Sequence, residues 1–75
     1  MNPAQRFTAI IEREDDGFVA LCPELDIASQ GDTVEEARKN LSEAIHLFFE
    51  VASPREIRDR IHEEVFITRL EVAVG

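Results

Sequence analysis

Acidic side chains are the most numerous groups in this sequence that could carry out chemistry. The chain has 16 Asp and Glu residues against 8 Lys and Arg residues, and a formal net charge of -8. Hydrolysis with two metal ions needs several carboxylates that converge from rigid elements onto ions about 4 Å apart. Most of the acids fall instead in expected turns or at the start of an expected helix, where they cap or solvate the chain. A small metal-dependent nuclease is therefore the least favoured function, and we expect a protein that is not an enzyme.

One cysteine and two histidines are the other candidates for a nucleophile or a metal ligand. Cys22 stands before Pro23, and a thiol is an effective nucleophile where a histidine or a helix terminus lowers its pKa. His46 and His62 form no His-x-x-x-His motif. We expect Cys22 to be a small buried apolar residue and both histidines to lie on helix surfaces. The sequence has no phosphate-binding loop or dinucleotide-binding turn, so we expect neither a cofactor nor a metal.

The acids are concentrated in one part of the chain. Nine of them lie between Glu12 and Glu36 with Arg13 as the only base, whereas acids and bases balance in the remainder. Such a concentrated field can steer a basic protein toward this segment, although solvated turns around strands are the plainer explanation for any run of charges. The candidates for contact with a partner are Glu14, Asp15, Asp16, Glu24 and Asp26.

Three short strands are expected in the first half of the chain. Residues 7–12 are rich in β-formers, and the Asp-Gly pair that ends at Gly17 is typical of a tight hairpin, with the glycine allowing the turn. Residues 18–22 form the returning strand, which Pro23 ends because proline cannot donate to a sheet ladder. Residues 25–30 are long enough for a third strand. The first two strands do not alternate cleanly between apolar and polar residues, a pattern typical of a hairpin covered on both faces.

Two helices are expected next. Thr33 and Glu36 have the spacing of a capping box, in which each side chain satisfies a free amide of the first turn. The apolar residues that follow recur every three or four positions, as on one stripe of an amphipathic helix. They are Val34, Ala37, Leu41, Ala44, Ile45, Phe48 and Ala52. Ser53, Pro54 and Glu56 then begin a second, short helix that reaches about residue 62.

A long final strand is expected over residues 65–74, which are rich in β-branched residues and alternate in their second half. The whole chain then reads as one α+β domain over residues 1–75. Its elements are a three-stranded antiparallel meander, one long helix, a short second helix and the final strand, in the order β-β-β-α-α-β.

The chain length limits the core and favours self-association. A domain of 75 residues buries only roughly 60% of the surface of its unfolded chain. The sequence has neither the disulfides nor the metal cluster that often stabilise small domains, so a homo-oligomer is the remaining route. Leu47, Phe49 and Val51 widen the apolar stripe of the long helix and are the candidate oligomer interface; extra cover for the core is the alternative. The sequence has no membrane span or signal peptide, and we expect a cytoplasmic protein.

The order of the motifs resembles that of HicB-like antitoxins. A strand that ends at Glu12 leads to Asp16-Gly17, and the next strand runs into Pro23-Glu24-Leu25. Gly31-Asp32-Thr33 then opens the helix with Glu35-Glu36-Ala37. The match covers residues 7–50, roughly two thirds of the chain.

This resemblance implies a partial ribonuclease-H-like fold without the catalytic acids of the nuclease. It also implies a partner, a small basic RNA-cleaving toxin of the HicA type, which the antitoxin neutralises by covering its active surface in a stoichiometric complex. Many HicB proteins continue into a DNA-binding segment. This sequence shows no such C-terminal domain, so we do not expect direct DNA binding. A self-associating structural or regulatory module without a toxin partner is the alternative function.

Overall fold

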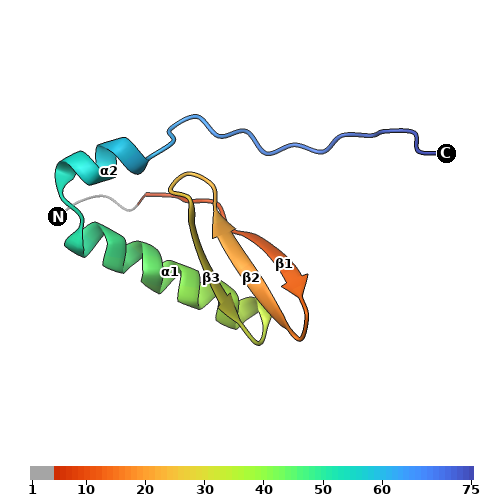
Figure 1. Ribbon diagram of the computed structural model, residues 1–75, viewed down its shortest axis with the longest axis horizontal. Coiled ribbons are helices and arrows are strands. Elements are labelled where there is room, and N and C mark those ends of the chain that lie inside the picture. Colours follow the sequence, from red (N-terminus) through yellow and green to blue (C-terminus); the bar gives the residue numbers. More distant parts are fainter. Residues whose placement is uncertain (1–4) are drawn as a thin grey trace.

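The computed structural model describes residues 5–75, which form a three-stranded sheet, two helices and a long extended segment (Figure 1). The strands are β1 (Ile10–Glu14), β2 (Gly17–Cys22) and β3 (Ile27–Gly31), and the sheet order is β1-β2-β3. The helices are α1 (Val34–Val51) and α2 (Pro54–Arg60). The expected α+β class and the antiparallel meander are confirmed. β1 and β3 each begin later in the chain than the sequence pattern indicates.

The β1–β2 hairpin turns through Asp15 and Asp16, and Glu14 pairs with Gly17 at its tip. Asp15 has a φ of 53°, whereas no described glycine has a positive φ. The hairpin forms where the Asp-Gly pair indicates, and its left-handed residue is Asp15 and not Gly17. Aspartate tolerates this conformation better than most residues because its short polar side chain can bond locally.

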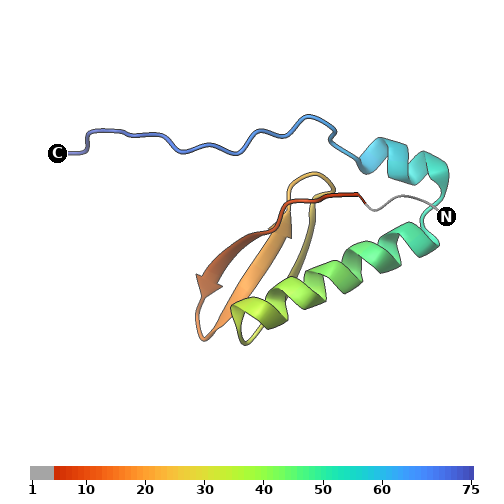
Figure 2. The ribbon, with the colours of Figure 1, turned by 180° about the vertical axis from the view of Figure 1, so that it is seen from behind.

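Helix α1 covers one face of the sheet. It packs mainly on β3, less on β2 and least on β1, and only this helix lies against the strands in the two opposite views (Figures 1 and 2). The core consists of small and medium side chains from the sheet, the β2–β3 turn and the helix. Its fully buried members are Ala20, Cys22, Leu25, Ala37 and Leu41. Burial of Cys22 is confirmed. The other face carries no helix, so the expectation of a hairpin covered on both faces is not met within residues 5–75.

Gly31 brings the end of β3 against the start of α1. A Cβ at this position would lie 2.5 Å from the backbone nitrogen of Ala37. Because a side chain would push the first helical turn away, glycine here permits the close approach of strand and helix. The closeness of these two backbones fixes where the helix begins relative to the sheet.

Both helices begin at the expected caps. Thr33 Oγ1 accepts a hydrogen bond from the backbone nitrogen of Glu36 at 3.0 Å. Ser53 and Glu56 form a complete reciprocal capping box at the start of α2. The three apolar residues of α1 predicted as an oligomer interface differ in their exposure. Leu47 and Val51 are 56% and 73% exposed, whereas Phe49 is half-buried and packs against the core. None of the helices within residues 5–75 is long and apolar enough to cross a membrane.

The expected final strand is not formed. Residues 65–74 are extended and leave the body of the molecule from the end of α2 (Figure 1). Every ladder of the described residues joins β1, β2 and β3 only. An alternating pattern gives a segment the conformation and the two faces of a strand, but a strand also needs a neighbour for its backbone hydrogen bonds.

Candidate protein-binding site

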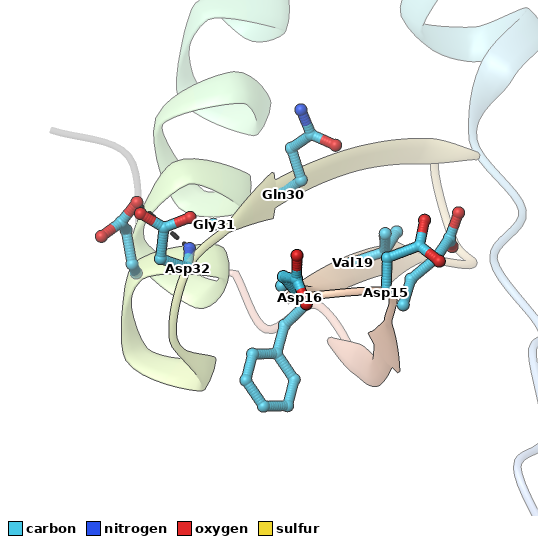
Figure 3. Close-up of a pocket in the computed structure, with 10 residues that line it drawn as sticks. Asp15, Asp16, Val19, Gln30, Gly31 and Asp32 are labelled. Carbon is cyan, nitrogen blue, oxygen red and sulfur yellow. Dashed lines mark hydrogen bonds between the residues drawn. The ribbon is translucent and has the colours of Figure 1, made fainter.

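Several acids of the first half of the chain meet at one end of the sheet, around a hollow of about 430 Å³. The hollow lies between the β1–β2 turn, the end of β3 and the first turn of α1 (Figure 3). Five carboxylates line it, and we call this set the acidic rim. Its members are Glu14, Asp15, Asp16, Asp32 and Glu36.

The acidic rim follows directly from the path of the chain. β2 runs away from the hairpin tip and β3 returns to it, so Asp32 arrives beside the Asp15–Asp16 turn (Figure 3). The carboxylate of Glu36 accepts a hydrogen bond from the backbone nitrogen of Asp32 at 3.3 Å. In an ordinary capping box this bond would come from the cap residue, Thr33. The displaced bond ties the start of the helix to the end of β3 and holds two acids close together.

Within residues 5–75, no Lys or Arg side chain forms an ion pair with a carboxylate of the acidic rim. The one contact of ion-pair geometry within these residues joins His46 Nε2 to Glu50 on the surface of α1, at 3.2 Å, and it is an ion pair only when His46 is protonated. The guanidinium of Arg13, the one base of this segment, instead lies 4.5 Å from the ring centroid of Phe18. Acids at the N-terminus of a helix are favourable with respect to the helix dipole, which makes this clustering tolerable in the folded state. An approaching protein therefore meets several carboxylates that no described Lys or Arg side chain pairs with.

Glu24 lies at the opposite end of the sheet and is engaged inside the chain. One of its carboxylate oxygens accepts from the backbone nitrogen of Thr8 at 2.9 Å, and the other accepts from the Thr8 hydroxyl at 2.6 Å. Partial burial tends to raise the pKa of Glu24, but these hydrogen bonds to the charged form outweigh it and lower the pKa below its ordinary value. This carboxylate fastens the chain before β1 to the turn after β2.

Asp26 also lies at this opposite end, in the β2–β3 turn. Its φ is 55° and it is exposed. Its carbonyl oxygen and that of Leu25 accept hydrogen bonds from the side chain of Arg60, at 3.1 and 2.8 Å. The five acids predicted as a contact set therefore separate into three at the hairpin and two at the far turn.

Asp32 and Glu36 complete the acidic rim but were not among the predicted contact residues. The signal for them was present in the sequence. In a meander of three strands, the third strand must end beside the first turn, so the residues after β3 lie next to Asp15 and Asp16. Reading the acids by topology instead of by sequence proximity would have grouped them correctly.

The face of the sheet opposite α1 lies beside the acidic rim and is partly apolar. Ile10 is 36% exposed, and Val19 and Leu21 are half-buried. Val19 also lines the acidic hollow and, with Ala28, a second shallow hollow on the sheet. A partner attracted by the carboxylates would thus find apolar surface next to them, as in the core and rim of ordinary protein interfaces.

The described residues offer little for catalysis. The thiol of Cys22 donates to Glu24 at 3.4 Å, and burial raises its pKa, which lowers its reactivity as a nucleophile. His46 is exposed on the surface of α1, as expected. His62 is exposed but lies beyond α2, which ends at Arg60, so its expected place on a helix surface is wrong. Within residues 5–75, no group of three or more His, Cys, Asp or Glu side chains is arranged to hold a metal ion.

Two curated proteins of Synechocystis sp. are similar to this chain. UPF0150 protein ssr1765 is 50% identical over 46 residues, which are 59% of this chain and 58% of that protein. UPF0150 protein ssl0738 is 53% identical over 45 residues, which are 57% of this chain and 62% of that protein. The chain thus spans less than two thirds of the length of the curated relatives it matches. No family model matches the chain, and no solved structure matches it significantly.

Proposed function

We propose that this protein is an antitoxin-like binding protein that neutralises a basic, RNA-cleaving toxin of the HicA type in the cytoplasm, without enzymatic activity of its own. One observation carries the proposal: five carboxylates from the hairpin, β3 and α1 line one hollow, and no base within residues 5–75 pairs with them. The class of the partner, a HicA-type toxin, is inferred from the motif order, which resembles that of HicB antitoxins. The similarity to two UPF0150 proteins is compatible with a small module of this kind.

The acidic rim acts first on the approach of the toxin. Complementary charges raise association rates strongly at low ionic strength and lose most of this effect when salt screens them. Apolar contact with the open face of the sheet, around Val19 and Leu21, then holds the complex together. On this account the charges set the rate and orientation of binding, and the apolar surface sets its lifetime.

The test uses a HicA-type toxin from the same genome and three neutralising substitutions at the hairpin, E14Q, D15N and D16N. Asparagine at position 15 retains the positive φ of the turn. Stopped-flow association of this triple variant should be roughly ten-fold slower than wild type at low salt and nearly equal at high salt. The matched control neutralises three exposed acids elsewhere, E43Q, E63Q and E64Q, and should slow association much less.

A separate measurement tests neutralisation itself. An equimolar amount of the protein should abolish RNA cleavage by the toxin. Failure to inhibit the toxin at any ratio would refute the proposed function, and the alternative, a self-associating module without a toxin, would take its place. Equal association rates of the triple variant and wild type at every ionic strength would remove the acidic rim from the mechanism.

A further inference from the structure

The extended C-terminal segment exposes a row of large apolar side chains. Phe66, Leu70, Val72 and Val74 are each between 68% and 89% exposed. They occupy even-numbered positions, so in a strand they stand on one face. Exposed apolar surface of this extent in a segment of strand conformation marks an interaction site.

The segment is fastened at its start and free beyond it. The backbone nitrogen of His62 donates to the carbonyl oxygen of Glu24 at 2.7 Å, which fixes the point where the chain leaves the body. From there the segment runs past the sheet without joining it, in both views of the molecule (Figures 1 and 2). It follows an extended path in both views and none of its residues has a positive φ, so its backbone can pair as a strand without a change of hand at any residue.

We propose that residues 65–74 form a dimerisation strand, which pairs antiparallel with the same segment of a second copy of this chain about a two-fold axis at Leu70. In this register Leu70 faces Leu70 of the second copy, Phe66 faces Val74, and Thr68 faces Val72. On the other face of the ribbon, Arg69 of each copy lies directly opposite Glu71 of the other. The interface is self-complementary, as a two-fold interface must be.

Charge selects this register over its neighbours. A shift that moves the axis to Arg69 places two arginines opposite each other, and a shift to Glu71 does the same with two glutamates. If the axis lay midway between two residues, even-numbered positions would face odd-numbered ones. Opposite residues share a face of the ribbon, so Arg69 and Glu71 would then lie opposite residues of the apolar row. Only the axis at Leu70 joins both opposite charges and keeps the apolar row continuous.

The length of residues 65–74 favours pairing with the same segment of a second copy over pairing with the sheet of its own chain. The two edge strands, β1 and β3, have 5 residues each, half the length of the segment. Either edge would leave several backbone groups of the segment without partners. Another copy of the segment matches it over the whole length. A two-stranded ribbon is marginal by itself, so we expect a dissociation constant of roughly 10–100 µM.

A charge swap tests the register in the full-length chain. Arg69→Glu and Glu71→Arg each create two like-charge pairs across the axis, and each should weaken dimerisation roughly ten-fold in sedimentation equilibrium. The double variant R69E/E71R restores both pairs and should recover the wild-type constant. Arg55→Glu and Glu43→Arg make the same changes of net charge on the helices and should leave the constant unchanged.

Cysteine cross-linking tests the position of the axis directly. In a C22A background, Leu70→Cys places two cysteines opposite each other at a Cα separation of about 5 Å, within reach of a disulfide. Val72→Cys places them roughly 14 Å apart, because each faces position 68 of the partner. The first variant should form a covalent dimer under mild oxidation and the second should not.

Two results would overturn the inference. One is a wild-type protein that stays monomeric at ~500 µM, well above the expected dissociation constant. The segment would then pair with the sheet of its own chain or with another protein. The other is a double variant as weak as either single one, which would exclude this register. The inference does not depend on the proposed function, since neither test involves a toxin.

Discussion

Replacing Gly31 by alanine tests the close approach of β3 and α1. The added methyl carbon would lie 2.5 Å from the nitrogen and 3.0 Å from the Cα of Ala37, and 2.8 Å from the carbonyl carbon of Glu36. All three are backbone atoms of the first helical turn, so no side-chain rotation relieves the contact. The start of α1 must move away from the sheet, which loosens the packing of Ala37 and Leu41.

The size of the effect follows from two opposing terms. Overpacking of this kind costs about 1–3 kcal/mol. The lower entropy of the unfolded alanine chain offsets about 0.4–1 kcal/mol of that cost, because Gly31 has no positive φ that alanine would have to adopt. We expect a net loss of about 1–2 kcal/mol in the free energy of unfolding. In a domain of this size such a loss lowers Tm by roughly 4–16 °C.

Thermal unfolding followed by circular dichroism measures this loss, with the other two glycines as controls. A Cβ at Gly17 would meet one atom at close range, the carbonyl oxygen of Gly31 at 2.9 Å, and a Cβ at Gly75 would meet nothing within 4 Å. The expected order of destabilisation by alanine is Gly31, then Gly17, then Gly75. A Gly31→Ala variant as stable as wild type would show that β3 and α1 are not held this close in solution.

Three further outcomes are expected. Because the pKa of Glu24 is lowered in the folded state, its contribution to stability is complete above the unfolded value, roughly 4.3, and is lost as the pH falls through the lower folded value; urea unfolding across this range should show a smaller acid dependence in E24Q. The buried thiol of Cys22, whose pKa is raised, should react slowly with Ellman's reagent in the folded protein and rapidly in urea, and equal rates would contradict its burial. The protein should not cleave RNA or DNA with magnesium or manganese, and cleavage that is lost on mutating Asp15, Asp16 or Asp32 would contradict the absence of enzymatic activity.

Local signals in the sequence predicted local structure well. The side chains of Thr33 and Ser53 cap their helices as expected, because each cap depends on residues three positions apart. The reciprocal bond of the capping box forms at Ser53 but not at Thr33, where Glu36 accepts from Asp32 instead. The hairpin lies where the Asp-Gly pair indicates, but its left-handed residue is Asp15, not Gly17. Turn signals locate a turn more reliably than they assign the conformation of each residue in it.

Contacts between distant parts of the chain could not be predicted in this way. The hydrogen bonds from Thr8 to Glu24 join residues 16 positions apart, and no periodic pattern encodes them. The acidic rim depends on the return of β3 to the hairpin, which places Asp32 on the same hollow as Asp15 and Asp16. The prediction of a final strand was wrong for the same reason. The composition of residues 65–74 favours an extended conformation but does not specify a neighbouring strand within the chain.

The hydrogen bonds around the β2–β3 turn imply an uneven resistance to local opening. Thr8, Arg60 and His62 all form hydrogen bonds to residues 24–26. These bonds hold together the end of the molecule at which the chain enters and leaves the sheet and helix. The hairpin tip at the other end has exposed side chains and no such hydrogen bonds. Among the amide hydrogens of the sheet, those of the hairpin tip should therefore exchange with solvent first, through fluctuations that leave the core intact. The acidic rim thus sits on the most compliant part of the sheet, where it can adjust to the shape of a docking surface at little cost in folding free energy.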